Sequence, residues 1–336
     1  MPSIQRDSKK IVIAGASSLL GAELKSLLEE SRFADRDIRL LDEDIAAGTL
    51  TESGGEAAVI QPVEEGSFDH AQFVFFTGSS DFTLANLTAA VHDASFVIDC
   101  SGASLEIASA KRGVAWFPKL DALLGRDFPK DEKVFAIPSA GGAITSSLTL
   151  ALSKIGLQRL AVVHFRSVSD AGKAGIEELE SQTGQLLSFQ GVGQPVFDAQ
   201  VAFNLLDRFG ARSAHKLSAV RERIAQEVAA SVGGKAQAPA VQVLHAPVFY
   251  GAAFTAFAEL PTQDAAAVSA ACRDAGLALD TAESAPSNVS AAGESLIHIS
   301  TPEPDAAKPG AWWFWGAADN IRLPASNAVK LAEMLA

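Results

Sequence analysis

The stretch that decides the fold runs from residue 10 to residue 30 and reads KIVIAGASSLLGAELKSLLEE. Its first five residues form a short apolar run rich in β-branched side chains, which predicts a buried strand. The segment GASSLLG at residues 15–21 follows as a turn, and residues 22–30 have helical periodicity. A strand, a glycine-bounded turn and a helix in this order indicate the first unit of an α/β sheet.

The same alternation continues as far as residue 99. Apolar runs predict further strands at residues 38–41, 58–60, 73–76 and 95–99, and residues 82–92 have a helical pattern. Strands that alternate with helices predict a doubly wound parallel sheet.

The pattern changes after residue 133. Longer segments that alternate between apolar and polar residues predict a mostly antiparallel sheet with one covered face. The WWFW run at residues 312–315 is interpreted as sheet core plus interface. The expected strands are 158–168, 240–249 and 255–260, and the expected helices are 175–190, 215–231, 263–275 and a final one within 320–336.

Composition narrows the classes of function. The chain has 336 residues, enough for two domains, and its net charge of −13 opposes binding to nucleic acid or to an anionic membrane. The residues before the first strand are not expected to form a signal peptide, and no apolar run reaches the roughly 20 residues of a membrane span. Two cysteines, Cys100 and Cys272, make no disulfide framework, so a reduced, cytoplasmic location is the default expectation.

Eight stretches together carry a family resemblance. They are IVIAGASSLLGAEL (11–24), FTGSS (76–80), VIDCSGAS (97–104), FAIPSAGG (135–142), VSDAGKAGIEELE (168–180), VAFNLLDRFG (201–210), HAPVFYGAA (245–253) and WGAADNIR (315–322). In this order and spacing they resemble the aspartate-semialdehyde dehydrogenase family nearly end to end. The acetylglutamyl-phosphate reductases are a weaker match.

The resemblance implies an architecture and a reaction. A Rossmann-type NAD(P)-binding domain would span residues 1–132, and an α+β domain with the active site and the dimer interface would span residues 133–318. Residues 319–336 would return as a C-terminal helix to the first domain. The family reductively dephosphorylates an acyl phosphate with NADP in amino-acid biosynthesis, using a cysteine thiolate as nucleophile and a histidine as proton carrier.

Residue by residue, the family's catalytic set is missing. Ala140 stands in place of the cysteine, and Ala252 stands in place of the histidine. Arg166 replaces the orienting glutamine, and Leu105 replaces a phosphate-binding arginine. An alanine methyl has no lone pair and cannot form a thioester. His245 lies seven residues before Ala252, about 23 Å along a strand, and is not expected to substitute for the histidine.

A relocated nucleophile is the alternative to lost chemistry. Ser139 adjoins Ala140, but a serine needs a general base and none is evident nearby. Cys100, at a predicted strand end, is the better candidate, and its competing interpretation is a small buried thiol. Cys272 has helical periodicity around it and is interpreted as core or interface filler. No metal site is indicated.

The nucleotide turn is altered as well. Ser18 stands where the family usually has a glycine that admits the phosphates. Asp42, Glu43 and Asp44 would repel the 2′-phosphate of NADP, although Asp42 could bind the ribose hydroxyls of NAD. A solvated acidic turn is the competing interpretation of these three carboxylates, so NADP is disfavoured, and NAD and an empty cleft stay open.

The resemblance also marks the remaining cofactor contacts. Asp170 replaces the glycine of a Ser-Gly pair near the cofactor, and Asn327 resembles an asparagine near the nicotinamide. The full set of expected contacts is Gly15, Ser17, Ser18, Leu19, Leu20, Gly21, Asp42, Ser169, Asp170 and Asn327.

Three functions therefore compete. The first is a catalytically inactive homologue that acts through binding or dimerisation, as a homodimer or as a hetero-oligomer with an active relative. The second is an oxidoreductase of the same type with an altered active site that uses NAD, with Cys100 as the candidate nucleophile. The third is a working aspartate-semialdehyde dehydrogenase with substituted residues.

Overall fold

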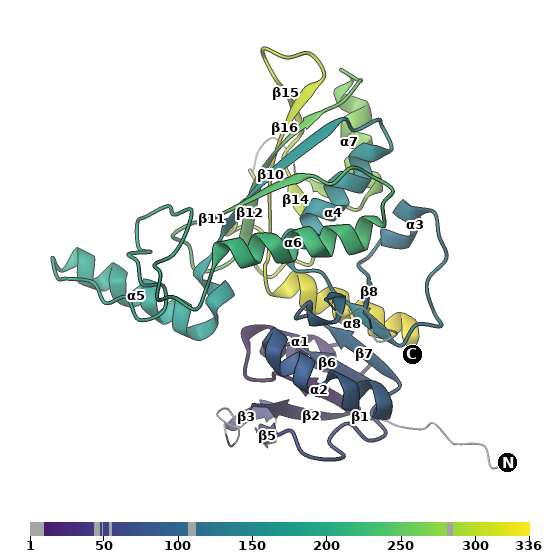
Figure 1. The fold of residues 1–336 in the computed structure, drawn as a ribbon, viewed down its shortest axis with the longest axis vertical. Helices are drawn as coiled ribbons and strands as arrows, with labels where there is room; N and C mark the ends of the chain where they lie inside the picture. Colours follow the sequence, from purple (N-terminus) through teal and green to yellow (C-terminus); the bar gives the residue numbers. More distant parts are fainter. Residues whose placement is uncertain (1–9, 44–47, 49, 54–55, 107–111, 281–284) are drawn as a thin grey trace. The chain divides into compact units, whose positions relative to one another are not determined.

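The computed structural model describes residues 10–43, 48, 50–53, 56–106, 112–280 and 285–336. These residues form two compact units (Figure 1). The first contains the described residues up to Trp116, together with Pro129–Ile137 and Pro324–Ala336. The second contains Phe117–Phe128 and Pro138–Leu323.

The first unit is built on a seven-stranded sheet in the order β5-β2-β1-β6-β7-β9-β8, with every neighbouring pair parallel. This confirms the predicted doubly wound parallel sheet. The strands are β1 (Lys10–Ala14), β2 (Asp37–Asp42), β5 (Gln61–Pro62), β6 (Phe73–Phe76), β7 (Phe96–Asp99), β8 (Val114–Ala115) and β9 (Val134–Ala136).

Serine hydroxyls begin the two long helices that follow β1 and β6. Ser18 caps α1 (Leu19–Glu29) by accepting from the Gly21 N–H, and Ser79 caps α2 (Ser80–Asp93) by accepting from the Phe82 N–H. The short η1 (Ala103–Leu105) follows β7, and α8 (Arg322–Leu335) belongs to this unit from Pro324 onward.

One predicted strand lies elsewhere. Residues 58–60 were expected to extend the parallel sheet, but they fall at the end of β4 (Glu56–Val59), which pairs with β3 (Leu50–Ser53) in a separate antiparallel hairpin. The edge of the parallel sheet is formed instead by the two residues of β5. A local hairpin competes here with pairing to the larger sheet, and the apolar run alone does not distinguish the two.

The second unit has a mixed, mostly antiparallel sheet, as predicted. Its order is β11-β10-β12-β16-β14-β13, with β15 added on β16. Only the pairs β10–β11 and β13–β14 are parallel among its described pairings. The strands are β10 (Arg159–Arg166), β11 (Ala240–His245), β12 (Ala252–Glu259), β13 (Ala278–Leu279), β14 (His298–Ile299), β15 (Glu303–Pro304) and β16 (Ala311–Ala318).

Helices cover one face of this sheet. Side chains of α4 and α7 join those of β10, β12 and β16 in one apolar cluster, and α6 packs on α4.

Within the described residues, no helix has the length and apolar character that a bilayer crossing requires. The helices are α3 (Leu120–Leu124), α4 (Ala140–Ser153), η2 (Val168–Ala171), α5 (Gly172–Leu187), α6 (Leu217–Val232) and α7 (Ala265–Asp274).

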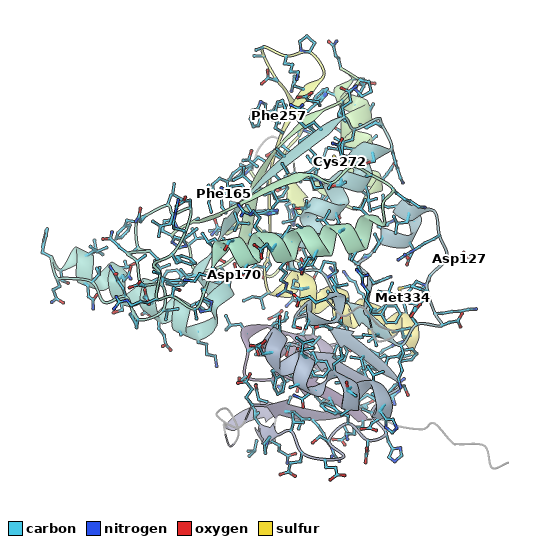
Figure 2. All side chains as sticks on the ribbon, in the orientation of Figure 1. Asp127, Phe165, Asp170, Phe257, Cys272 and Met334 are labelled. Atoms are coloured by element: carbon cyan, nitrogen blue, oxygen red, sulfur yellow. The ribbon has the colours of Figure 1, made fainter. Side chains whose placement is uncertain are left out.

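The opposite face of the sheet carries aromatic side chains. Trp312 and Phe314 are buried under the helices, whereas Trp313 and Trp315 are 44% and 39% exposed. The Trp313 ring lies 5.0 Å from the ring of Phe257, and the Trp315 ring lies 6.2 Å from that of Phe165. Phe257 and Phe165 are labelled in Figure 2. Strand alternation therefore divides this run between the core and an open apolar face.

Candidate functional site

The positions matched to the family cysteine and histidine fall in one apolar cluster. Ala140 is the first residue of α4 and Ala252 is the first residue of β12. Their exposed fractions are 2% and 3%, and Ile144 and Phe254 belong to the same cluster. Both positions thus belong to the core of the second unit, and neither methyl group can attack a carbonyl or carry a proton.

The N-terminus of α4 is occupied by a carboxylate of this chain. Glu227, on α6, accepts from the Ser139 N–H at 3.0 Å and from the Ser139 hydroxyl at 2.6 Å. Arg223 Nε lies 2.8 Å from Glu227 Oε1 and forms an ion pair with it. The Glu227 side chain is 1% exposed, so this contact lies in the interior of the second unit.

Gly142 shows how closely the carboxylate approaches. A Cβ built on Gly142 would lie 2.1 Å from Glu227 Oε2, a distance that no side chain could accept without displacement. A helix N-terminus has a positive end that can hold an anion or a thiolate. Glu227 fills that place. Its role was not predicted from the sequence, because Arg223 and Glu227 have the i,i+4 spacing that is typical of a solvated helix face.

Arg166 lies between His245 and Ala252 on three neighbouring strands of the second sheet. It is the Cα partner of Ala252 across the antiparallel β10–β12 pair and of His245 across the parallel β10–β11 pair. The expectation of a strand over 240–249, with His245 about 23 Å from Ala252, is therefore wrong. β11 ends at His245, and the chain turns back, so the two lie two strand spacings apart, about 10 Å.

His245 is nonetheless a core histidine. Its Nε2 lies 3.1 Å from the Val201 carbonyl oxygen, and its ring packs 5.5 Å from that of Phe209. Burial lowers the pKa of His245, partly offset by the Val201 contact, so the ring is neutral at neutral pH. The interpretation of His245 as a strand histidine bonded to a neighbour fits these contacts.

Asp170 neutralises Arg166 and connects it to the scaffold. The Arg166 Nε and an Asp170 carboxylate oxygen form an ion pair. Asn320 donates from Nδ2 to Asp170 at 2.9 Å and to the Ser169 hydroxyl at 3.0 Å. Its Oδ1 accepts from the Gly251 N–H at 2.8 Å, which ties η2, the turn before β12 and the segment after β16 together.

Leu105 and Cys100 lie in the first unit. Leu105 ends η1 with 7% exposure, and Cys100, directly after β7, is 4% exposed. The Asp99 carboxylate accepts from the Ser101 N–H at 2.7 Å and from the Ser104 N–H at 2.8 Å, which shapes this loop. The burial of Cys100 favours the small-thiol interpretation. Cys272, on α7, is buried too, and its burial raises the pKa of its thiol to about 12 against a smaller opposing effect of Arg273.

A cavity of about 240 Å³ opens beside Arg166 within the second unit. Arg166 and Asp170 line it from the end of β10 and from η2, and His215 and Lys216 line it from the start of α6. His215 and Lys216 were not among the site residues predicted from the sequence. Their signal was weak, because two polar residues before a helical pattern are common at any helix start.

The expected phosphate turn makes internal contacts in the first unit. The Ser17 N–H donates to Asp42 at 2.7 Å, and the Ser18 hydroxyl donates to the Thr77 carbonyl at 2.9 Å. Gly15 has a φ of +96°, and a Cβ on Gly21 would lie 2.5 Å from the Gly15 carbonyl oxygen, so both glycines are required by the turn itself.

The other predicted cofactor residues are dispersed. Leu19 and Leu20 form the start of α1, and Asn327 lies buried on α8 of the first unit. Ser169 and Asp170 belong to η2 of the second unit. Of the acidic turn, Asp44 lies outside the described residues.

The chain is similar to proteins described as semialdehyde dehydrogenases and as USG-1 homologues. The family model described as semialdehyde dehydrogenase, dimerisation domain, matches residues 149–323, more than half of the chain. The chain is 28% identical to the USG-1 protein homologue of Azotobacter vinelandii over 334 residues, and 26% identical to the aspartate-semialdehyde dehydrogenase of Rickettsia bellii over 337 residues. Each alignment covers 97% of both sequences.

Solved structures show the same fold. The probable aspartate-semialdehyde dehydrogenase from Pseudomonas aeruginosa superimposes with a TM-score of 0.83 at 27% sequence identity. The superposition covers 97% of this chain and 98% of that one. The architecture of this chain is therefore similar to that of these enzymes over nearly its whole length.

Proposed function

The chain belongs to the semialdehyde dehydrogenase family, and from that premise we propose that it is a non-catalytic member that acts through binding and dimerisation. The observation that carries the proposal is the contact between Glu227 and Ser139 at the start of α4. Where the family is expected to hold a reactive thiolate, this chain has Ala140 beside a buried carboxylate, and the carboxylate would oppose a thiolate there.

Two further observations support the proposal. Ala252 packs in the same apolar cluster as Ala140, so the matched nucleophile and proton carrier are both replaced by core side chains. Cys100, the candidate replacement nucleophile, is buried at 4% exposure, and a thiol that water does not reach is a poor nucleophile.

Dimerisation is proposed through the open face of the second sheet. Phe165, Phe257, Trp313 and Trp315 present aromatic rings on that face, and such residues are enriched in the centres of interfaces. The partner is a second copy of the chain or an active relative that presents the same face. We also propose three domains, with limits at residues 1–132, 133–318 and 319–336, and a cytoplasmic location.

An NAD-dependent oxidoreductase is the second candidate, and Asp42 is the observation that favours it. Its carboxylate ends β2 beside the glycine turn and accepts from the Ser17 N–H, where a ribose-binding carboxylate would stand. Binding of NAD in preference to NADP, measured by calorimetry and thermal shift, would favour this candidate. Absence of binding of either at millimolar concentration would eliminate it.

The test of the main proposal is an assay of the purified protein for NADP- and phosphate-dependent oxidation of aspartate semialdehyde. No turnover above that of a heat-inactivated sample is expected. Turnover by this chain, with a catalytically competent family member as the positive control, would refute the proposal.

A further inference from the structure

The cavity beside Arg166 has the size of a small organic ligand. Its volume is about 240 Å³, which is larger than the roughly 150 Å³ of an engineered cavity that binds benzene. The walls come from three places in the second unit: the end of β10 with η2, the segment between α5 and α6, and the first turn of α6. One ring or branched chain with a small polar group would fill it.

The charged groups of the cavity leave one uncompensated cation. Arg166 and Asp170 form an ion pair, so their charges offset each other. His215 is neutral at neutral pH, because burial lowers its pKa more than the nearby Asp170 raises it. Among the described residues that line the cavity, this leaves the ammonium group of Lys216 as the cation that forms no ion pair. The hydrogen bond from Arg212, and to a smaller extent the charge of Lys216, lowers the pKa of Asp198, but Asp198 is ion-paired with Arg212. One positive charge therefore remains, which favours an anion of single charge.

The rest of the lining is mainly apolar. The rings of Phe197 and Phe209 lie 4.6 Å apart and form one wall. Leu217, Ala219 and Val220 of α6 also line the cavity. A doubly charged phosphate ester would have to lose its water beside these side chains with one cation to compensate it, whereas an apolar body would gain by burial.

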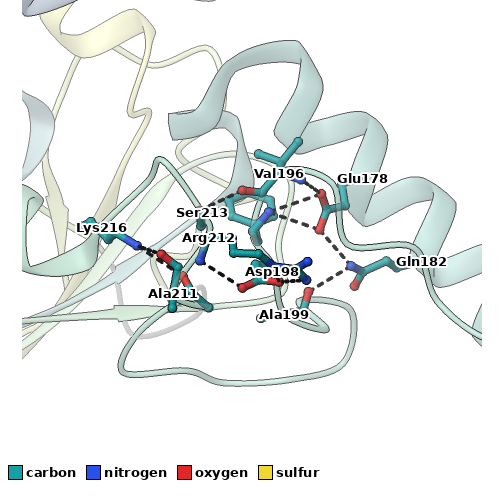
Figure 3. A network of polar contacts seen from close by, with 11 residues as sticks. Glu178, Gln182, Val196, Asp198, Ala199, Ala211, Arg212, Ser213 and Lys216 are labelled. Carbon is teal, nitrogen blue, oxygen red and sulfur yellow. Dashed lines mark hydrogen bonds and ion pairs between the residues drawn. The ribbon is translucent and has the colours of Figure 1, made fainter.

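A buried polar network holds the aromatic wall in place (Figure 3). Glu178, on α5, accepts from the Val196 N–H and, at 3.4 Å, from the Phe197 N–H. Gln182 donates to the Ala199 carbonyl at 3.1 Å and accepts from the Val201 N–H at 2.8 Å. Glu178 and Gln182 are 4% and 0% exposed, so this wall is fixed before any ligand arrives.

The same segment continues to the cation. The Ser213 hydroxyl donates to the Val196 carbonyl at 2.7 Å, and Lys216 Nζ donates to the Ala211 carbonyl at 2.9 Å (Figure 3). Lys216 Nζ also donates to the Gly210 carbonyl at 3.3 Å, so these bonds restrict Lys216 and leave one of its three N–H groups for a ligand. The charge and the aromatic wall are therefore held in one rigid segment.

We propose that this cavity binds a small monocarboxylate whose body is a single aromatic ring or a branched alkyl chain, with the carboxylate at Lys216 and the body against Phe197 and Phe209. The inference rests on the proposed binding role of the protein and supplies the class of its ligand.

Calorimetric titration of the full chain with benzoate and phenylacetate tests the proposal. Saturable binding with a dissociation constant of ~1 mM or tighter is expected. Benzamide, the neutral isostere of benzoate, should bind about tenfold more weakly, because it lacks the charge-assisted bond. Inorganic phosphate and L-aspartate should show no saturable binding in the same range.

Three variants locate the site. Lys216→Met should weaken benzoate binding about tenfold, and Ala219→Trp should abolish it by filling the cavity. Lys173→Met, which removes an exposed lysine of α5 outside the cavity lining, should leave it unchanged. Far-ultraviolet circular dichroism of each variant confirms that the chain is folded.

The outcomes separate this inference from the proposed function. Absence of benzoate and phenylacetate binding, equal affinity for benzamide, or binding that survives both Lys216→Met and Ala219→Trp would overturn the inference and leave the non-catalytic proposal intact. Turnover of aspartate semialdehyde would refute the non-catalytic proposal without affecting a measured affinity for benzoate.

Discussion

Glu227 accepts two hydrogen bonds from Ser139, one from its backbone N–H and one from its hydroxyl, directly before the first residue of α4. The contact joins α6 to the start of α4 inside the second unit. It places a carboxylate at the helix end that would stabilise an anion, and this location makes the chemistry of Ala140 testable.

A cysteine introduced at residue 140 should have no more than the ordinary reactivity of a thiol. In Ala140→Cys the positive end of α4 is already occupied by Glu227, so the pKa of the new thiol should not fall below its usual range. Adding Glu227→Gln, whose amide oxygen can still accept from Ser139, should raise the alkylation rate with iodoacetamide at pH 7 about tenfold. Equal rates in the single and double variants would contradict this account, and the unsubstituted chain gives the background from Cys100 and Cys272.

Two glycine substitutions should have opposite effects on stability. Gly142→Ala would place a methyl group 2.1 Å from Glu227 Oε2, and we expect it to lower the free energy of unfolding by about 1–3 kcal/mol. Gly184→Ala, on α5, meets no atom within 4 Å and should raise it by about 0.5–1 kcal/mol through helix propensity. Urea denaturation of both variants measures the difference. A neutral Gly142→Ala would mean that Glu227 does not occupy the start of α4.

The open sheet face should control the oligomeric state. Replacing Trp313 and Trp315 by lysine removes two aromatic side chains from that face, so the proposed dimer should become a monomer at micromolar concentration. Light scattering coupled to gel filtration measures the mass directly. Met334→Lys, an exposed apolar position on α8, is the matched control and should retain the dimer. A dimer that persists in the double variant would place the interface elsewhere.

Acid should destabilise the chain through His164, in β10. Burial, and then the charge of Arg166, lowers the pKa of His164 to about 3, against 6.5 for an unperturbed histidine. The unfolded chain therefore takes up a proton below pH 6.5 while the folded chain does not, and stability falls as the pH drops from 6.5 toward 3. At pH 5 this histidine alone should cost about 2 kcal/mol.

The His164→Gln variant isolates this contribution. Its glutamine can still contact Thr145, which lies 2.8 Å from His164 Nε2. Between pH 7 and pH 5 the variant should lose about 2 kcal/mol less stability than the unsubstituted chain, measured by urea denaturation at each pH. Equal losses in the two proteins would contradict the expectation that His164 takes up a proton in the unfolded chain but not in the folded chain.

The fold was largely readable from local patterns. The KIVIA run and the alternating segment of β12 each matched strands, because burial on one or two faces imposes a definite spacing of apolar residues. The extent of β11 was not predicted, although Pro247 and Gly251 signal the chain reversal that follows it. The apolar residues 248–250 between them favoured a longer strand instead.

The candidate site was harder to predict. The replacements predicted at Ala140 and Ala252 rest on residue identity within the family resemblance, so the sequence alone was enough to predict them. The position of Glu227 was not, because its neighbours in the sequence suggest a solvated helix and only the packing of α6 on α4 buries it. Lys216 and Phe197 meet in one cavity for a similar reason, since they come from segments joined by tertiary contacts.

The burial of Glu227 against Gly142 also bears on how a reactive thiol could be engineered into this chain. A cysteine at residue 140 alone would place a thiol at a helix end that already holds a carboxylate, and Ala252 would still supply no proton carrier. A cysteine–histidine arrangement would therefore need changes at Ala140, Ala252 and Glu227 together. Because Glu227 lies in the interior of the second unit, any such redesign would have to repack that interior as well.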